Sequence, residues 1–303
     1  MTLVVAGIDG GQSSTIAVIG DENGCILGRG TGGPADEIGV DADSTRMHDA
    51  LLAALEDASR CAQLAHGSRF DAIVAGVSGY NDRVYGRLPQ LPSERFIMMH
   101  DAPVAHAAAL AGQPGVVIIA GTGSVVYTRD AAGSGLTLGG WGFLFGDEGS
   151  AFRIASDALA MLMRAQDDGD GSFADETRAA CEFFAMPGLR QIGRAFYHGE
   201  LARDRLASFA PAALRFERFR TIADRGADRL AALACRAIAA GAAARVGLAG
   251  GIFADAEFSQ RLGDAIRATV PEADVERARY EPAAGALLLA YRELGIEVGE
   301  LRE

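Results

Sequence analysis

Cysteine is scarce in this sequence, and the four cysteines lie far apart in its 303 residues: Cys25, Cys61, Cys181 and Cys235. No Cys-x-x-Cys pair occurs, so the pattern predicts neither a disulfide framework nor a cysteine-based metal site. Isolated cysteines are typical of proteins in a reducing compartment. We therefore expect this protein in the cytoplasm.

Basic residues are also few: 28 Lys and Arg stand against 40 Asp and Glu, which gives a formal charge of −12. Nucleic acids and anionic membrane surfaces are bound through basic patches, so this balance argues against both as partners. No apolar run approaches the roughly 18 residues of a membrane-spanning helix. A phosphorylated ligand would have to be held by backbone donors and a metal rather than by a basic cluster.

Glycine, in contrast, is abundant, and it is concentrated where apolar runs end. An apolar run through Ile8 is followed by Asp9-Gly10-Gly11, by small polar residues including Ser13, and by a second apolar run. This pattern predicts a strand, a tight turn and a second strand, with the glycines supplying the positive φ of a hairpin turn. The turn's N–H and hydroxyl donors suit a phosphate. An ordinary β-hairpin with a glycine turn is the alternative.

The same pattern occurs again about a hundred residues later. Residues 115–120 form an apolar run, Gly121-Thr122-Gly123-Ser124 a second small-residue turn, and residues 125–127 another β-prone run. A third strand is expected after each pair, at 25–29 and 136–138. Two copies of one meander predict a duplicated α/β fold of two domains with a cleft between them.

The rest of the chain fits two domains of this kind. Helical spacing over 47–64, a buried strand over 70–77, a largely helical stretch over 172–244, a strand over 246–249 and a last helix over 283–294 are expected. We predict an N-terminal domain, 1–112, joined by the C-terminal helix at 283–295. The C-terminal domain, 113–282, carries a helical insertion.

Several motifs together resemble a known family. They are Gly7-Ile8-Asp9-Gly10-Gly11-x-Ser13, Asp101-Ala102, Ala120-Gly121-Thr122-Gly123-Ser124, Gly140-Trp141-Gly142 with Gly146-Asp147-Glu148-Gly149-Ser150, and Gly250-Gly251. In this order they resemble the N-acetylglucosamine kinase branch of the BadF/BadG/BcrA/BcrD ATPases, in the actin/heat-shock ATPase/sugar-kinase superfamily. The resemblance implies two ribonuclease H-like domains, with ATP and a sugar in the cleft, and a homodimer.

The resemblance also implies roles for the nucleotide side. Asp101 matches a catalytic base that accepts a proton from the sugar hydroxyl; the alternative is an N-cap of the helix near Pro103. Asp9 matches an acid that orients Mg²⁺ through water, the alternative being an acid that closes a turn. The cofactor-binding positions are Gly10, Gly11, Gln12 and Ser13 in the first phosphate turn, Thr122 and Gly123 in the second, and Gly250 and Gly251 beside adenosine, where the alternative is a strand-to-helix turn.

The sugar side is implied by the loop around the only tryptophan. Asp147 matches a residue that accepts from sugar hydroxyls, and Gly140, Trp141 and Gly142 line the same pocket. The alternatives are an N-cap for Asp147 and loop packing for Trp141. Glu148 and Ser78 receive no role.

Asp36 departs from the family pattern, because relatives that phosphorylate N-acetylglucosamine carry asparagine in this loop. A carboxylate accepts hydrogen bonds but donates none, and it adds a charge. One interpretation is a preference for a sugar with a protonated amine, such as glucosamine. The other is that Asp36 accepts from the same sugar hydroxyl as asparagine does.

The predicted activity is that of an ATP- and Mg²⁺-dependent hexosamine kinase acting on the 6-hydroxyl of N-acetylglucosamine. Glucosamine or another amino sugar is the alternative substrate, and a non-catalytic sugar sensor is a further alternative. Two related classes carry iron–sulfur clusters or structural zinc on grouped cysteines, and the isolated cysteines disfavour both.

Overall fold

The computed structural model describes residues 3–37, 40–130 and 133–302. Over this part of the chain there are two five-stranded sheets, each with helices packed on it. The chain forms two compact units, each with one of the sheets. Unit 1 comprises residues 1–114, 131–135 and 278–303, and unit 2 comprises residues 115–130 and 136–277. The predicted α/β class is confirmed. Within the described ranges, no helix has both the length and the apolar composition needed to cross a bilayer.

The sheet of unit 1 has the order β3-β2-β1-β4-β5. Its strands are β1 (Val4–Gly10), β2 (Thr15–Asp21), β3 (Ile26–Gly32), β4 (Phe70–Val77) and β5 (Ser93–His100). The first three form an antiparallel meander, and β4 and β5 run parallel to β1. Gly10 pairs with Val77, and Val77 pairs with His100. The carboxyl ends of the three parallel strands therefore lie in one row.

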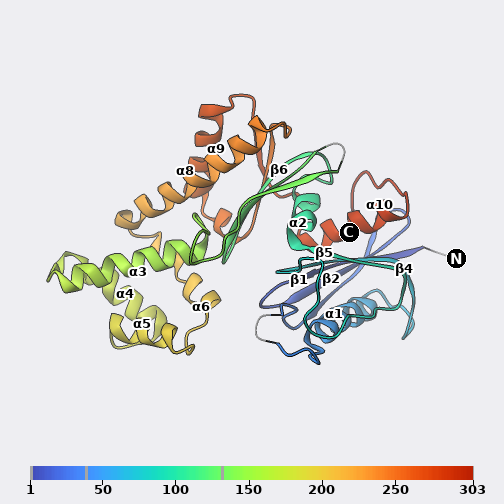
Figure 1. Cartoon of the computed structure of the whole chain (residues 1–303), viewed down its shortest axis with the longest axis horizontal. Helices are drawn as coiled ribbons and strands as arrows, with labels where there is room; N and C mark the ends of the chain where they lie inside the picture. Colours follow the sequence, from blue (N-terminus) through green and yellow to red (C-terminus); the bar gives the residue numbers. More distant parts are fainter. Residues whose placement is uncertain (1–2, 38–39, 131–132, 303) are drawn as a thin grey trace. The chain divides into compact units, whose positions relative to one another are not determined.

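Helices cover both faces of this sheet (Figure 1). On one face packs α1 (Arg46–Cys61), whose buried residues recur at helical spacing. On the other face lie α2 (Asp101–Ala109) and the C-terminal α10 (Pro282–Glu293). Helix α10 packs directly on β1, so the last helix of the chain completes the core of the N-terminal unit.

The sheet of unit 2 has the order β10-β9-β6-β7-β8. Its strands are β6 (Gly115–Ala120), β7 (Ser124–Arg129), β8 (Gly135–Gly139), β9 (Arg245–Ala249) and β10 (Asp274–Arg277). Strands β6 and β7 are antiparallel, whereas β9 is parallel to β6 and β10 is parallel to β9. The arrangement repeats that of unit 1, as the duplicated sequence pattern predicts.

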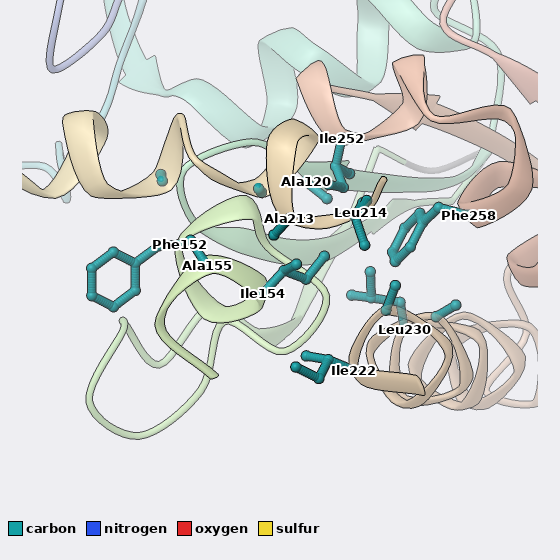
Figure 2. Close-up of a cluster of buried hydrophobic side chains, with 14 of the residues drawn as sticks. Ala120, Phe152, Ile154, Ala155, Ala213, Leu214, Ile222, Leu230, Ile252 and Phe258 are labelled. Carbon is teal, nitrogen blue, oxygen red and sulfur yellow. The ribbon is translucent and has the colours of Figure 1, made fainter. Parts of the chain in front are cut away.

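Unit 2 contains most of the helical residues. Its helices are α3 (Ala151–Asp167), η1 (Gly171–Phe173), α4 (Ala174–Phe184), α5 (Leu189–Tyr197), α6 (Arg203–Ala207), α7 (Ala210–Ala213), α8 (Glu217–Ala239), η2 (Gly251–Ala254) and α9 (Ala256–Thr269). Figure 2 shows how their apolar side chains meet: Ile154 of α3, Leu230 of α8 and Phe258 of α9 belong to one buried cluster. Because β6 also contributes Ala120 to this cluster, the core holds the end of β6 in place.

Candidate functional site

In unit 1, polar side chains gather where the three parallel strands end. Asp9 is the penultimate residue of β1, Ser78 follows β4, and Asp101 follows β5. The backbone N–H of Ser78 donates to the carbonyl of Gly10 at 2.9 Å, which continues the pairing of β4 with β1 beyond the strand. The carboxyl edge of a parallel sheet is where α/β proteins bind ligands, so this edge is the candidate site of unit 1.

The first glycine turn differs in detail from its prediction. Neither Gly10 nor Gly11 has a positive φ, because Gly10 pairs with Thr15 as the last residue of β1 and the turn spans residues 11–14. The N–H of Gly11 donates to the carbonyl of Ser14 at 2.9 Å, so it is used inside the turn. The exposed residues Gln12 and Ser13 form the accessible part of the turn.

Asp9 is a carboxylate in an unfavourable environment. Burial, and then repulsion from Asp101, raise the pKa of Asp9 from its usual 3.8 to about 7. Within the described residues, the carboxylate of Asp9 forms no ion pair or hydrogen bond, although its backbone is paired in the sheet. Two nearby carboxylates, of which Asp9 has no cation partner in the described chain, fit a hydrated Mg²⁺, which binds oxygen ligands and keeps part of its water. The described part of the chain has no group of three or more candidate metal ligands, so the protein would supply few of the ligands.

Asp101 is the first residue of α2, and its neighbour His100 caps that helix. The backbone N–H of Ala102 donates to Nδ1 of His100 at 3.1 Å. The same Nδ1 lies 2.7 Å from Oδ1 of Asp101. Unprotonated Nδ1 accepts from Ala102, whereas protonated Nδ1 donates to Asp101, and this second contact raises the pKa of His100. The alternative in which Asp101 caps the helix is therefore wrong, and its carboxylate, about one-third exposed, is accessible for other contacts.

The loop containing Asp36 is fixed at several points. The N–H of Ala35 donates to the carbonyl of Gly11 at 3.0 Å, which attaches the loop to the first glycine turn. Asp36 is 5% exposed, and its Oδ1 accepts from the Arg46 guanidinium at 2.8 Å. Glu37 accepts from the backbone N–H groups of residues 85 and 86, each at 2.7 Å. Asp36 is thus a buried acid whose charge already has a partner.

Thr15 serves the same loop and not a ligand. Its side chain is fully buried, and its hydroxyl donates to the carbonyl of Gly33 at 2.7 Å. The hydroxyl donors expected in the first turn are therefore those of Ser13 and Ser14, which are exposed.

In unit 2, the second glycine turn is bound to the start of α3. The N–H of Ala151 donates to the carbonyl of Gly121 at 2.8 Å, and the hydroxyl of Ser124 donates to the carbonyl of Glu148, also at 2.8 Å. Ser150 caps α3 by accepting from the N–H of Arg153 at 3.1 Å. The N–H groups of the first four residues of α3 are thus used inside the protein. Thr122 and Gly123 of the turn are the positions that can face an anion.

Asp147 lies against this second turn. A Cβ added to Gly123 would stand 3.0 Å from Oδ2 of Asp147, so glycine leaves the space that the carboxylate fills. Asp147 is 5% exposed and has a φ of 59°. Burial raises its pKa, while hydrogen bonds from the backbone of Ser124 and Gly142 and the charge of Arg203 act in the opposite direction. Because Ser150 is the cap of α3, the N-cap alternative for Asp147 is wrong.

The loop that carries Trp141 leaves large apolar side chains in solvent. Trp141 is 75% exposed and Phe145 is 83% exposed, whereas Phe143 is partly buried and packs on Phe152 with ring centroids 5.2 Å apart. Loop packing therefore does not account for the indole of Trp141. It is available to stack on a ligand.

The two glycines after β9 have different roles. Gly250 has a φ of 114°, and a Cβ there would lie 2.2 Å from the carbonyl oxygen of Ala120. The turn itself requires this glycine. Gly251 has open space around it, which allows a ligand to approach its backbone.

Sequence reasoning did not identify His100 and Arg46. Histidine is an uncommon helix cap, so no sequence pattern predicts that its imidazole contacts both the Ala102 N–H and the Asp101 carboxylate. Arg46 had a weak signal: a cation in the first turn of a helix is opposed by the helix dipole unless an anion pairs with it. Asp36 is that anion.

Two curated relatives match: an N-acetylmuramic acid/N-acetylglucosamine kinase of Clostridium acetobutylicum, 36% identical over 24% of this chain, and an N-acetyl-D-glucosamine kinase of Dictyostelium discoideum, 30% identical over 54%. The matched segments span 24% and 55% of those relatives' lengths.

A solved structure matches over almost the whole chain. It is a candidate N-acetylglucosamine kinase of Chromobacterium violaceum, 25% identical, with a TM-score of 0.77 over 95% of this chain and 99% of that one. The model of the BadF/BadG/BcrA/BcrD ATPase family matches residues 6–290, a range that includes every strand end and glycine turn described above except the first residues of β1. The chain therefore belongs to the BadF/BadG/BcrA/BcrD ATPase family.

Proposed function

We propose that this protein is an ATP-dependent sugar kinase that transfers the γ-phosphoryl group to the 6-hydroxyl of N-acetylglucosamine. The observation that carries the proposal is the pair of acids at the carboxyl edge of the unit 1 sheet. Asp101 begins α2 without capping it, and Asp9 has a raised pKa and no cation partner in the described chain. A base and a metal-orienting acid are the two carboxylates that such a transfer needs.

In the proposed reaction, Asp101 accepts the proton of the sugar hydroxyl while the hydroxyl oxygen attacks the γ-phosphorus. The bond from phosphorus to the β-phosphate oxygen breaks, and ADP leaves. Gln12 and Ser13, exposed in the turn that begins after Gly10 and Gly11, bind phosphate, as do Thr122 and Gly123 of the second turn. Asp9 would hold a Mg²⁺ ion through water, and that ion would supply positive charge against the phosphates.

The remaining residues are assigned to the two substrates. Asp147 accepts from sugar hydroxyls, and the loop with Gly140, Trp141 and Gly142 contacts the ring. Gly250 and Gly251 lie beside adenosine. The names of the relatives and of the structural neighbour support the choice of N-acetylglucosamine.

The test is a panel of N-acetylglucosamine, glucosamine, N-acetylmuramic acid and neutral hexoses in an assay of sugar-dependent ADP release. N-acetylglucosamine is expected to give the highest kcat/KM, with phosphate at O6 by NMR. If glucosamine gives the highest kcat/KM, glucosamine replaces N-acetylglucosamine as the proposed substrate. If no sugar is turned over, the non-catalytic sugar sensor is the remaining alternative. The homodimer implied by the resemblance and the cytoplasmic location expected from the isolated cysteines remain predictions, checked by light scattering and by fractionation.

A further inference from the structure

The loop of residues 33–37 contains two acids, and both are already partnered. Glu37 accepts two backbone N–H groups at 2.7 Å, and Asp36 accepts from Arg46 at 2.8 Å. The loop is also bonded to the first glycine turn through Ala35 and Gly11. The loop is therefore held in position, and both of its carboxylates have partners within the protein.

Arg46 occupies a position that a cation does not favour by itself. It is the first residue of α1, where the helix dipole destabilises positive charge. Its guanidinium reaches back ten residues to a carboxylate that is almost fully buried, while its own side chain keeps 37% exposure. A buried carboxylate without this partner would carry an uncompensated charge.

From this arrangement we propose that Arg46 is a specificity-determining residue, because it neutralises Asp36 and so makes the site select a neutral N-acetylated hexosamine over one with a protonated amine. The inference rests on the proposed kinase function and deepens it. With Arg46 present, Asp36 acts as a hydrogen-bond acceptor for a neutral group. Without Arg46, the same carboxylate is a free anion that attracts an ammonium group.

The experiment measures the ratio of kcat/KM for glucosamine to that for N-acetylglucosamine. Arg46→Gln is expected to raise this ratio at least tenfold, and Arg46→Lys, which keeps a cation, should stay within threefold of the native value. Asp36→Asn acts in the opposite direction, because it leaves Arg46 unopposed and lowers the ratio.

Arg60→Gln is the matched control. Arg60 lies on the same helix and bonds Asp57 at the same distance, 2.8 Å, but its side chain is 73% exposed and its partner is not part of the loop. It should leave the ratio unchanged. A ratio in Arg46→Gln within twofold of native overturns the proposal, as does a shift of equal size in Arg60→Gln.

A binding measurement separates failure of the kinase proposal from failure of the proposal on Arg46. If the native protein phosphorylates neither sugar, the kinase proposal fails. The ratio is then measured from the dissociation constants of the same two sugars, followed through the fluorescence of Trp141, the single tryptophan. The same shifts support the role of Arg46, and unchanged ratios reject it. Should Arg46→Gln not fold, Arg46→Met, which also removes the cation and keeps an unbranched side chain, provides the same decision.

Discussion

The two glycine turns share a sequence pattern but are supported differently. In unit 1 the turn of residues 11–14 closes on itself, and its acid, Asp9, stands without a protein cation in the described chain. In unit 2 the turn of residues 121–124 is bonded to the start of α3, and its acid, Asp147, has backbone donors and Arg203 nearby. Unit 1 keeps a carboxylate in an unfavourable state that a metal can relieve. Unit 2 holds its carboxylate in a fixed position that suits hydrogen bonding to a neutral ligand.

The largest expected effect tests whether the acids of unit 1 do the chemistry. Asp101→Asn should lower kcat by about 10³-fold, because a positioned general base contributes roughly 10²- to 10⁴-fold. Steady-state kinetics measures the loss, and sugar binding followed by Trp141 fluorescence should persist. A loss of less than tenfold, or about 1.4 kcal/mol, would be too small for a general base.

The second prediction tests the fixed position of Asp147 with a matched pair of variants. Gly123→Ala places a methyl group 3.0 Å from the Asp147 carboxylate, whereas Gly121→Ala adds a methyl group in open space. Displacement of the carboxylate should raise the KM for the sugar by about ten- to a hundredfold in Gly123→Ala, since a lost hydrogen bond to a charged group is worth roughly 1.5–3 kcal/mol. The KM of Gly121→Ala should stay within threefold of native; equal values for the two variants would contradict the assignment.

The third prediction concerns the free energy of unfolding of the metal-free protein. The pKa of Asp9 is raised to about 7 in the folded state, so the folded protein binds the proton more tightly and loses stability as the pH rises from about 4 to above 7. Asp9→Asn should therefore stabilise the protein at pH 8 by roughly 2 kcal/mol, reduced from a full linkage of about 4 kcal/mol because water reaches part of the carboxylate.

Urea unfolding at pH 8 and pH 4 measures this gain, which should disappear at the lower pH. Asp57→Asn is the control of opposite sign, because hydrogen bonds from Thr31 and Arg60 lower the pKa of Asp57 and its carboxylate stabilises the folded state. If Asp9→Asn destabilises the protein at pH 8, Asp9 is not the unfavourable carboxylate described here.

The smallest effect distinguishes the two contacts of His100. His100→Asn keeps a side chain that can cap α2, and His100→Ala removes it, so only the alanine variant should lose about 1 kcal/mol of stability at pH 9. The contact with Asp101 raises the pKa of His100. Native protein should therefore exceed His100→Asn in stability below pH 6.5 and lose this advantage as the pH rises through the raised pKa. A stability difference between native protein and His100→Asn that does not change with pH would contradict a role for the contact between His100 and Asp101.

Much of the fold followed from apolar periodicity and turn residues. The strand predicted at 70–77 is β4 with the same bounds, and the duplicated strand–turn–strand pattern corresponds to β1–β2 and β6–β7. Helix α2 begins at Asp101, earlier than the position near Pro103 that the sequence indicates, because the cap is His100, a residue type with little capping preference.

The candidate site was predictable to the extent that its residues follow strand ends. The acids at positions 9 and 101 stand at the edge of one sheet because β1 and β5 are parallel to β4. The partners of these acids were not predictable. The pairing of Asp36 with Arg46 depends on how the loop of residues 33–37 folds back on α1, and that path is set by bonds to Gly11 and to residues 85 and 86.

The packing of α10 on β1 has a consequence for synthesis. The core of unit 1 is formed by residues from segments 1–114 and 278–303. The ribosome synthesises the main segment of unit 2, residues 136–277, between these two segments. During translation, the apolar face of β1 that α10 covers stays exposed while unit 2 is synthesised and can already fold. We expect a nascent chain of this protein to be prone to aggregation during this interval, and a circular permutation that joins α10 to β1 should shorten it.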